Sequence, residues 1–303
     1  MSLLVFGHKS PDTDSVCSAI SLAYLKNKLG MEAKAYALEE PRKEAQFVLN
    51  YFNVAKPEIL KAGELKGKDV VLVDHNEIAQ TADEIGEANL VEIIDHHKIG
   101  GLSTDLPISL RIMPVGCTCT IVYSLFKENN VEIPYEIAGL LISAILSDTL
   151  IFKSPTTTKL DKEAVYALAK IAKVDYEKYG MEMFKAGTSL EGFSIDEIVN
   201  MDFKEFDMSG NRVGIGQVMT LDIDAVLSKK DEFLAYINGT EFDMLVLAIT
   251  DIINEGSYLI YKGEDKIISD AFSVGACQGV FAQGIVSRKK QLVPKLTDAV
   301  KNI

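Results

Sequence analysis

All four histidines of this 303-residue chain stand beside aspartates or just before them. His8 opens the pattern H-x-x-x-D-x-D, His75 follows an aspartate in VDHN, and His96 and His97 end the run IIDHH. These groups come at the ends of short apolar runs, and an open parallel sheet binds its ligand at the carboxyl ends of its strands. We therefore expect these side chains to lie close together in space.

The carboxylates of these motifs predict a metal centre. Carboxylates gathered at one edge of a sheet repel one another and shift one another's protonation unless a cation lies among them. Mixed imidazole and carboxylate donors suit Mn²⁺, Co²⁺ or Zn²⁺, whereas an all-oxygen donor set favours Mg²⁺ or Ca²⁺. The number of donors indicates two ions rather than one. The carboxylates concerned are those of Asp12, Asp14, Asp74 and Asp95.

Each motif taken alone also has a purely structural explanation. Asp12 and Ser15 suit the start of a helix that follows Pro11, and a single histidine after a strand is more often hydrogen-bonded than metal-bound. Helix capping does not explain why every histidine is involved, nor why D-H-H ends a strand. The combination of motifs therefore favours a metal centre.

The composition is that of a soluble globular protein with an acidic surface. Hydrophobic residues make up 48% of the chain and charged residues 25%, and the formal net charge is −13. This acidic balance argues against nucleic acid or an anionic membrane as a partner. The N-terminus lacks the features of a signal peptide, and the longest nearly unbroken apolar run, 137–146, is too short to span a bilayer. We expect a cytoplasmic location.

Apolar runs of strand length alternate with amphipathic stretches in the first half of the chain. This alternation predicts a doubly wound, mainly parallel sheet covered by helices. Strands are expected at 3–6, 33–38, 69–74, 90–95 and 107–114. Helices are expected at 15–30, 41–52, 77–86, 117–130, 134–150, 159–172 and 175–187.

The composition turns small, polar and glycine-containing at residues 187–192, where a flexible linker is expected. The pattern beyond it predicts strands around one helix, which is typical of a smaller mixed α/β domain. The expected limits are residues 1–186 for the N-terminal, metal-binding domain and residues 193–303 for a second, substrate-binding domain.

Four motifs together resemble the DHH phosphoesterase superfamily: GHKSPDTDS at 7–15, LVDHN at 72–76, IIDHH at 93–97 and AILSDT at 144–149. Exopolyphosphatases and RecJ-like nucleases share H-x-x-x-D-x-D and D-H-H, so these motifs indicate only the superfamily. SRKKQ at 287–291 is the narrower signal, because it makes the chain similar to a family II inorganic pyrophosphatase. The resemblance covers essentially the whole chain.

The resemblance implies a role for each residue of the metal centre. His8 and Asp12 are expected to bind one ion, Asp14, His96 and Asp148 the other, and Asp74 both. His97 matches the position that donates a proton to the leaving phosphate. His75 and Asp95 are expected to orient the ligands and tune their basicity.

The resemblance also implies the substrate, the cofactors and the reaction. Arg288, Lys289 and Lys204 match cations that bind the phosphates of pyrophosphate. Two Mn²⁺ per subunit, or Co²⁺ in their place, would hold a bridging hydroxide that attacks phosphorus, while Mg²⁺ arrives with the substrate. The products are two phosphates, formed in a cleft that closes about the linker. A homodimer is implied as well.

Two alternatives remain open at this level. An exopolyphosphatase or a short-oligonucleotide phosphodiesterase would share the metal motifs, but no histidine follows His97 and the chain has no tryptophan. These absences weaken the nuclease hypothesis, because related nucleases carry a histidine in their second domain and single strands bind aromatic residues. A non-catalytic sensor of metal or phosphate is the other alternative, and the presence of His97 argues against it.

Overall fold

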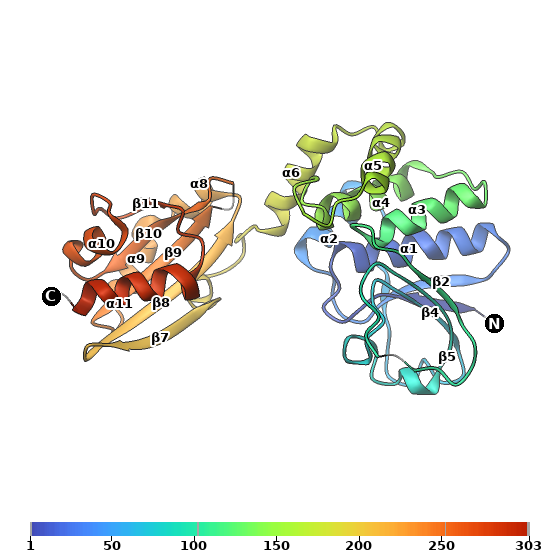
Figure 1. Ribbon diagram of the computed structural model, residues 1–303, viewed down its shortest axis with the longest axis horizontal. Helices are drawn as coiled ribbons and strands as arrows, with labels where there is room; N and C mark the ends of the chain where they lie inside the picture. Colours follow the sequence, from blue (N-terminus) through green and yellow to red (C-terminus); the bar gives the residue numbers. More distant parts are fainter. Residues whose placement is uncertain (1, 102, 252, 302–303) are drawn as a thin grey trace. The chain divides into compact units, whose positions relative to one another are not determined.

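The computed structural model describes residues 2–101, 103–251 and 253–301. The chain divides into two compact units, the first ending at Gly187 and the second beginning at Thr188, and both appear in Figure 1. None of the helices in these ranges is both long and apolar enough to cross a membrane. The flexibility expected for residues 187–192 stays a prediction.

The first unit is built on a six-stranded parallel sheet with the strand order β3-β2-β1-β4-β5-β6. The chain leaves β1 toward one edge of the sheet and returns to the other side of β1 with β4. A topological switch point, where open α/β sheets bind ligands, therefore lies between β1 and β4. The strands are β1 Leu3–Phe6, β2 Ala33–Ala37, β3 Glu58–Ile59, β4 Asp69–Val73, β5 Asn89–Asp95 and β6 Ser109–Ile112.

The helices of the first unit are α1 Thr13–Lys28, α2 Lys43–Tyr51, α3 Thr118–Glu128, α4 Tyr135–Asp148, α5 Lys159–Ala172 and α6 Tyr176–Gly187. They form one core with the sheet face that carries Val5, Val71 and Ile94, and Figure 1 shows these helices on one side of the sheet. Leu4 and Leu72 point to the opposite face, against which loop residues such as Leu65 and Ile85 of the 3₁₀ turn η2, Ile85–Glu87, pack. Another 3₁₀ turn, η1, spans Ile78–Gln80. Because both faces are buried at the centre of the sheet, β1 and β4 are its most apolar strands, whereas β2, β3 and β6 carry exposed polar residues.

The second unit contains a five-stranded mixed sheet in the order β11-β10-β9-β8-β7, in which only the β8–β9 pair is parallel. Separate apolar cores lie on the two faces of this sheet. Its strands are β7 Phe203–Met208, β8 Asn211–Thr220, β9 Met244–Asp251, β10 Gly256–Lys262 and β11 Val280–Gln283. Its helices are α7 Ile195–Asn200, α8 Ile223–Leu227, α9 Lys230–Asn238, α10 Asp265–Phe272 and α11 Val293–Lys301, with a π-helical turn, η3, at Arg288–Leu292.

The predicted fold class is confirmed: a mainly parallel sheet in the first unit and a smaller mixed α/β unit after it. The prediction of a helix over 77–86 is wrong, because this stretch forms η1 and η2 with Thr81 extended between them. The carbonyl of Gln80 accepts a hydrogen bond from the backbone N–H of Lys9 at 2.8 Å. In a continuous helix this carbonyl would accept from residue 84, whereas here it ties the segment to the loop that carries His8.

Gly139 provides a test of the packing in the first unit. A Cβ at this position of α4 would lie 2.3 Å from the ring of Phe52, which is buried. Alanine normally favours a helix over glycine by about 1 kcal/mol. At Gly139 the added methyl group would instead overpack the core, so the substitution should destabilise the protein. We expect Gly139→Ala to lower the free energy of unfolding by about 1–3 kcal/mol in urea denaturation. Gly86→Ala is the control, because no atom lies within 4 Å of its Cβ position; equal stability of the two variants would contradict the packing argument.

Candidate metal centre

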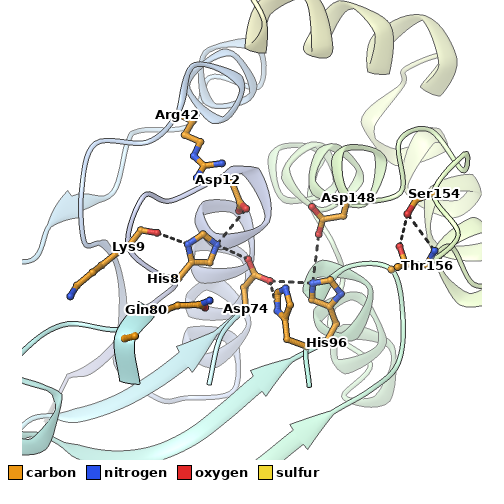
Figure 2. A pocket seen from close by; sticks show the side chains of 13 residues that line it. His8, Lys9, Asp12, Arg42, Asp74, Gln80, His96, Asp148, Ser154 and Thr156 are labelled. Atoms are coloured by element: carbon orange, nitrogen blue, oxygen red, sulfur yellow. Dashed lines mark hydrogen bonds and ion pairs between the residues drawn. The ribbon is translucent and has the colours of Figure 1, made fainter. Parts of the chain in front are cut away.

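The histidine and aspartate motifs come together beside the switch point of the first sheet. They follow the carboxyl ends of β1, β4 and β5, and the start of α1 and the end of α4 add further carboxylates. Figure 2 shows the cavity of about 590 Å³ that these elements surround. Its lining includes His8, Asp12, Asp74, His96, His97 and Asp148.

His8 presents a single ring nitrogen to the carboxylates. Its Nδ1 donates to the backbone carbonyl of Lys9 at 2.6 Å, which leaves Nε2 unprotonated in the neutral ring and available to a metal. Nε2 lies 3.4 Å from Asp12 Oδ2 and 3.4 Å from Asp74 Oδ2. Asp12 also accepts from the backbone N–H of Ser15 at 3.0 Å and thereby caps α1. The capping explanation and the ligand explanation of Asp12 are therefore compatible.

Asp74 lies between the two sets of donors. Its Oδ2 faces His8, and its Oδ1 lies 3.4 Å from Nε2 of His96 and accepts a hydrogen bond from Thr118 Oγ1 at 3.1 Å. The residue is buried and has a φ of 62°, in the left-handed region that aspartate tolerates better than most residues. This backbone turn directs the carboxylate across the end of the sheet, where each oxygen faces a different histidine.

Asp14, His96 and Asp148 form the donor set on the other side of Asp74. Asp14 is buried and accepts from the backbone N–H groups of Thr118 and Cys119 at 2.6 and 3.0 Å, at the start of α3. His96 Nδ1 donates to the carbonyl of Val115 at 3.1 Å, and His96 Nε2 lies 3.9 Å from Asp148 Oδ2. His96 therefore offers the same ring nitrogen as His8.

His97 has a different environment from His96. Its Nδ1 donates to Asp95 Oδ1 at 2.9 Å, and its side chain is 53% exposed, against 15% for His96. The hydrogen bond to Asp95 raises the pKa of His97. Asp95 is buried and also accepts from the backbone N–H of His97 at 3.1 Å and from the side chain of Asn76. This carboxylate therefore orients His97 and favours its protonated form.

His75 packs beside the donors without joining them. It is buried, its Nδ1 donates to the carbonyl of Val73 at 2.9 Å, and its ring meets that of His8 edge to face at a centroid distance of 6.3 Å. Burial lowers the pKa of His75. A neutral imidazole here supports the ring of His8 and adds no charge to the site.

The donor atoms fit divalent metal ions. Those of His8, Asp12 and Asp74 lie within 4.8 Å of one another, and so do those of Asp14, His96 and Asp148. Burial and the charge of Asp74 raise the pKa of Asp14 to about 7, and burial with the charges of its neighbours also raises that of Asp148. Such crowding of carboxylates is relieved by cations, and the mixed nitrogen and oxygen donors suit Mn²⁺ or Co²⁺.

The imidazoles also respond to this crowding. Burial by itself lowers the pKa of His8, but the hydrogen bonds and charges of Asp12 and Asp74 raise it to about 11. Burial likewise opposes protonation of His96, whereas Asp74 and Asp14 raise its pKa to about 9. The carboxylates therefore favour positive charge at this position, which protons on the rings or divalent ions would supply.

Cys117 and Cys119 also come close to Asp14. Both are buried, and burial raises the pKa of each thiol. Thiols bind metal as thiolates, so these side chains are poor ligands at neutral pH. They act as small packing residues at the start of α3, as their position in the core indicates.

A left-handed turn begins two residues after Asp148. Leu150, Ile151 and Phe152 have φ values of 49°, 50° and 67°, which cost free energy for side chains other than glycine. Packing holds the turn: Ile151 contacts α6 where Gly180 has no Cβ, and the ring of Phe152 lies 5.6 Å from that of Tyr176. The turn brings Ser154 and Thr156 into the lining of the cavity.

Several lining residues carry no signal in the sequence. Arg42, which precedes α2, lines the cavity, and its backbone N–H donates to the carbonyl of Pro11, next to Asp12, at 3.1 Å. Gln80, Ser154 and Thr156 line the cavity as well, and the last two share a hydrogen bond of 2.7 Å. They belong to loops whose course depends on packing elsewhere in the unit. For Arg42, the available signal in the sequence is its positive charge near a helix start in a strongly acidic chain.

The expected phosphate-binding cations belong to the second unit. Arg288 opens η3, and its guanidinium forms an ion pair with Asp202 at 2.7 Å. Its backbone N–H donates to Oε1 of the buried Gln217 at 3.0 Å. Lys289 and Lys204 are exposed, the first in η3 and the second in β7. Within this unit, the contact with Asp202 brings Arg288 to the start of the strand that carries Lys204.

The ends of SRKKQ fix the backbone of this basic turn. Ser287 Oγ accepts from the backbone N–H of Lys290 at 3.3 Å. Gln291 Oε1 accepts from the backbone N–H groups of Val286 and Ser287, both at 2.9 Å. The flanking serine and glutamine therefore hold the three basic residues in place, which explains why the motif extends beyond its charges.

Family models match both halves of the chain. The DHH family N-terminal domain matches residues 2–145, and the DHHA2 domain matches residues 181–299. The class of protein defined by the fold and the donor set is thus a two-domain DHH protein.

The curated relatives and solved structures narrow the class. A probable manganese-dependent inorganic pyrophosphatase from Staphylococcus epidermidis is 49% identical over 303 residues, with 98% of each chain covered. The crystal structure of a putative family II inorganic pyrophosphatase from Methanococcus jannaschii is 42% identical, with 99% of each chain covered and a TM-score of 0.62. An exopolyphosphatase-related protein from Bacteroides fragilis shares the fold at 12% identity and a TM-score of 0.52, with 99% of this chain and 92% of that one covered.

The chain belongs to the family II, manganese-dependent inorganic pyrophosphatases. The resemblance predicted from the four metal motifs and SRKKQ is confirmed. The roles assigned to individual residues stay predictions, although the geometry brings every expected metal donor to one cavity or its wall.

Proposed function

We propose that this protein hydrolyses inorganic pyrophosphate to two phosphates with two Mn²⁺ ions, or Co²⁺ in their place, and with Mg²⁺ bound to the substrate. One observation carries the proposal: each oxygen of the Asp74 carboxylate lies 3.4 Å from the Nε2 of a different histidine, His8 on one side and His96 on the other. This arrangement suits a carboxylate that serves two ions at once.

The proposed ligands divide into two sets. His8 and Asp12 would hold one ion, Asp14, His96 and Asp148 would hold the other, and Asp74 would serve both. When bound, two divalent ions lower the pKa of an attacking water and offset the charge of the phosphates. The hydrogen bonds from Nδ1 of His8 and His96 to backbone carbonyls hold both rings with Nε2 toward the site.

His97 is the proposed acid for the leaving phosphate. In hydrolysis the oxygen of water forms a new bond to one phosphorus, and the bond from that phosphorus to the bridging oxygen breaks. The departing phosphate then needs a proton on the oxygen it keeps. His97 can donate it from Nε2, because Nδ1 is held by Asp95 and the ring is exposed to the cavity.

Arg288, Lys289 and Lys204 are the proposed phosphate-binding cations. A guanidinium can hold two phosphate oxygens at once, and the ammonium groups add point charges. Asp202 and Gln217 support the proposal, because they hold the side chain and the backbone of Arg288 in one orientation. The homodimer, the cytoplasmic location and the movement of the linker at 187–192 also stay predictions.

Removal of the metal ions tests the proposed function. We expect exhaustive chelation to abolish phosphate release from pyrophosphate, because the attacking water then loses its activation. Mn²⁺ or Co²⁺ should restore the rate better than Zn²⁺ or Mg²⁺ alone, as the mixed imidazole and carboxylate donors indicate. Phosphate release and bound metal are measured on the same samples.

The same assay compares substrates. Pyrophosphate should be cleaved far faster than long polyphosphate, cyclic dinucleotides or short oligonucleotides. Full turnover in metal-stripped protein would refute the two-metal mechanism, and equal turnover of a dinucleotide would refute the proposed substrate.

The two histidines of D-H-H should respond differently to replacement by glutamine. His97→Gln removes a proton donor and not a proposed ligand, so we expect normal metal content and a loss of rate of about 10²- to 10⁴-fold. His96→Gln should weaken Mn²⁺ binding, with activity partly recovered at high Mn²⁺. Metal analysis and steady-state kinetics check both. A His97→Gln protein that lost its metals, or kept full activity, would reverse the assignment.

Arg288→Ala tests the cations of the second unit. We expect normal Mn²⁺ binding, because no proposed ligand is touched, and a loss of rate of about 100-fold or more, by analogy with removal of an oxyanion donor. Arg288→Lys should recover part of the rate, since it keeps the charge and loses the planar fork. Lys290→Ala is the matched control in the same turn. Near-normal activity of Arg288→Ala would mean that the three basic residues of SRKKQ are ordinary solvated surface residues and do not bind the phosphates.

A further inference from the structure

Glu44, in the first turn of α2, connects two segments that carry proposed metal ligands. Its Oε1 accepts a hydrogen bond from Thr13 Oγ1 at 2.6 Å and another from Ser147 Oγ at 2.5 Å. Thr13 is the first residue of α1, and Ser147 lies in the last turn of α4. One oxygen atom thus joins the start of one helix to the end of another, and these positions are 31 and 103 residues away from Glu44 in the sequence, respectively.

The two hydroxyl residues stand directly beside ligands. Thr13 lies between Asp12 and Asp14, and Ser147 precedes Asp148. Figure 2 shows Asp12 and Asp148 reaching the cavity from the ends of separate helices. A relative movement of these helix ends would change the distances within both donor sets. Holding the two ends together therefore keeps the carboxylates at spacings that fit the ions.

The surroundings of Glu44 hold its side chain in place. Its carboxylate is partly buried. Gly187, the last residue of α6, lies so close that a Cβ there would be 2.9 Å from Glu44 Cβ. The side chain is therefore packed among α1, α4 and α6, and little room is left for it to turn away. A constrained oxygen with two short hydrogen bonds is a rigid connection.

We infer that Glu44 is a positioning residue for the metal centre, whose Oε1 fixes the start of α1 against the end of α4 and so sets the separation of Asp12 and Asp14 from Asp148. The inference rests on the proposed assignment of these three aspartates as ligands. Glu44 itself need not touch an ion. Groups of this kind typically change metal affinity by 10- to 100-fold when they are removed.

The role of the shared oxygen can be separated from the role of the charge. Glutamine keeps an oxygen that can accept both hydrogen bonds but carries no charge, whereas alanine loses the oxygen as well. We expect Glu44→Ala to weaken Mn²⁺ binding by about 10- to 100-fold. Glu44→Gln should stay within about threefold of the native affinity. Mn²⁺ affinity is measured by calorimetry and by the electron paramagnetic resonance signal of the free ion.

Variants of the two hydroxyl partners complete the design. Thr13→Val and Ser147→Ala each remove one hydrogen bond to Oε1, and each should weaken Mn²⁺ binding less than Glu44→Ala does. Because both act through one atom, the double variant should match Glu44→Ala, and adding Glu44→Ala to it should change little. Glu163→Gln is the control, since Glu163 is an exposed residue of α5 that pairs only with Lys159 among the described contacts.

The outcomes distinguish this inference from the proposed function. Loss of affinity in Glu44→Ala, rescue by Glu44→Gln and non-additivity support the positioning role. Urea denaturation first shows that each variant is folded under the conditions of the binding assay. Native Mn²⁺ affinity in folded Glu44→Ala overturns the positioning role and leaves Glu44 a role in stability alone. Equal weakness of the glutamine and alanine variants overturns the shared-oxygen mechanism in favour of charge. Failure of the native protein to bind Mn²⁺, or native affinity in Asp148→Asn, overturns the proposed ligand set and the inference with it.

Discussion

The Asp74 carboxylate between two imidazoles is the interaction on which the rest of the site depends. Its two oxygens lie 3.4 Å from His8 and from His96, and it is buried with Asp14 close by. Buried carboxylates are costly unless cations or hydrogen-bond donors compensate them. The protein supplies imidazoles, the hydroxyl of Thr118 and two backbone N–H groups at the start of α3. Because these donors are spread over separate segments, the fold must keep those segments in register.

The parallel sheet performs most of this task. Its switch point between β1 and β4 opens a crevice at the carboxyl ends of the strands, and the loops after β1, β4 and β5 converge there. The start of α3 is held in turn by Asp161, which accepts from the backbone N–H of Gly116 at 2.9 Å and from Thr120 Oγ1 at 2.6 Å. Asp161 is fully buried and also caps α5. A carboxylate outside the cavity thus supports the donors that surround Asp14.

The part of the site that could be predicted from the sequence is the part that follows strands. Asp74 and His96 come directly after apolar runs, and the rarity of histidine made the pattern visible. Asp148 lies at the end of an apolar helix, where the residues alone indicate only a helix-end polar group, and it was found through the resemblance. Arg42 and Glu44 gave no signal, because their positions depend on how α2 packs against other helices.

The fold shows the same limit. The alternation of apolar runs predicted the parallel sheet because both faces of its central strands, β1 and β4, are buried, which leaves a strong pattern there. The exposed two-residue edge strand β3 left no such pattern. The segment 77–86 has the composition of a helix but is held by a long-range hydrogen bond to Lys9, and local composition contains no information about such a contact. The left-handed turn at residues 150–152 could not be predicted either, because it also depends on contacts with residues distant in the sequence. It depends on the absence of a Cβ at Gly180 and on the ring of Tyr176.

His96 and His97 show how neighbouring residues of one type acquire different chemistry. At the end of β5 their Nδ1 atoms reach different acceptors, a backbone carbonyl for His96 and the Asp95 carboxylate for His97. A neutral carbonyl fixes the tautomer of His96 and leaves its Nε2 to the buried donors. A carboxylate also stabilises the charged ring, and its hydrogen bond raises the pKa of His97, which is far more exposed. Despite burial, the pKa of His96 is raised as well, by Asp74 and Asp14, so protonation does not separate the two rings. Their positions do, although both come from a single D-H-H motif: Nε2 of His96 faces Asp74 and Asp148, whereas the ring of His97 is exposed to the cavity.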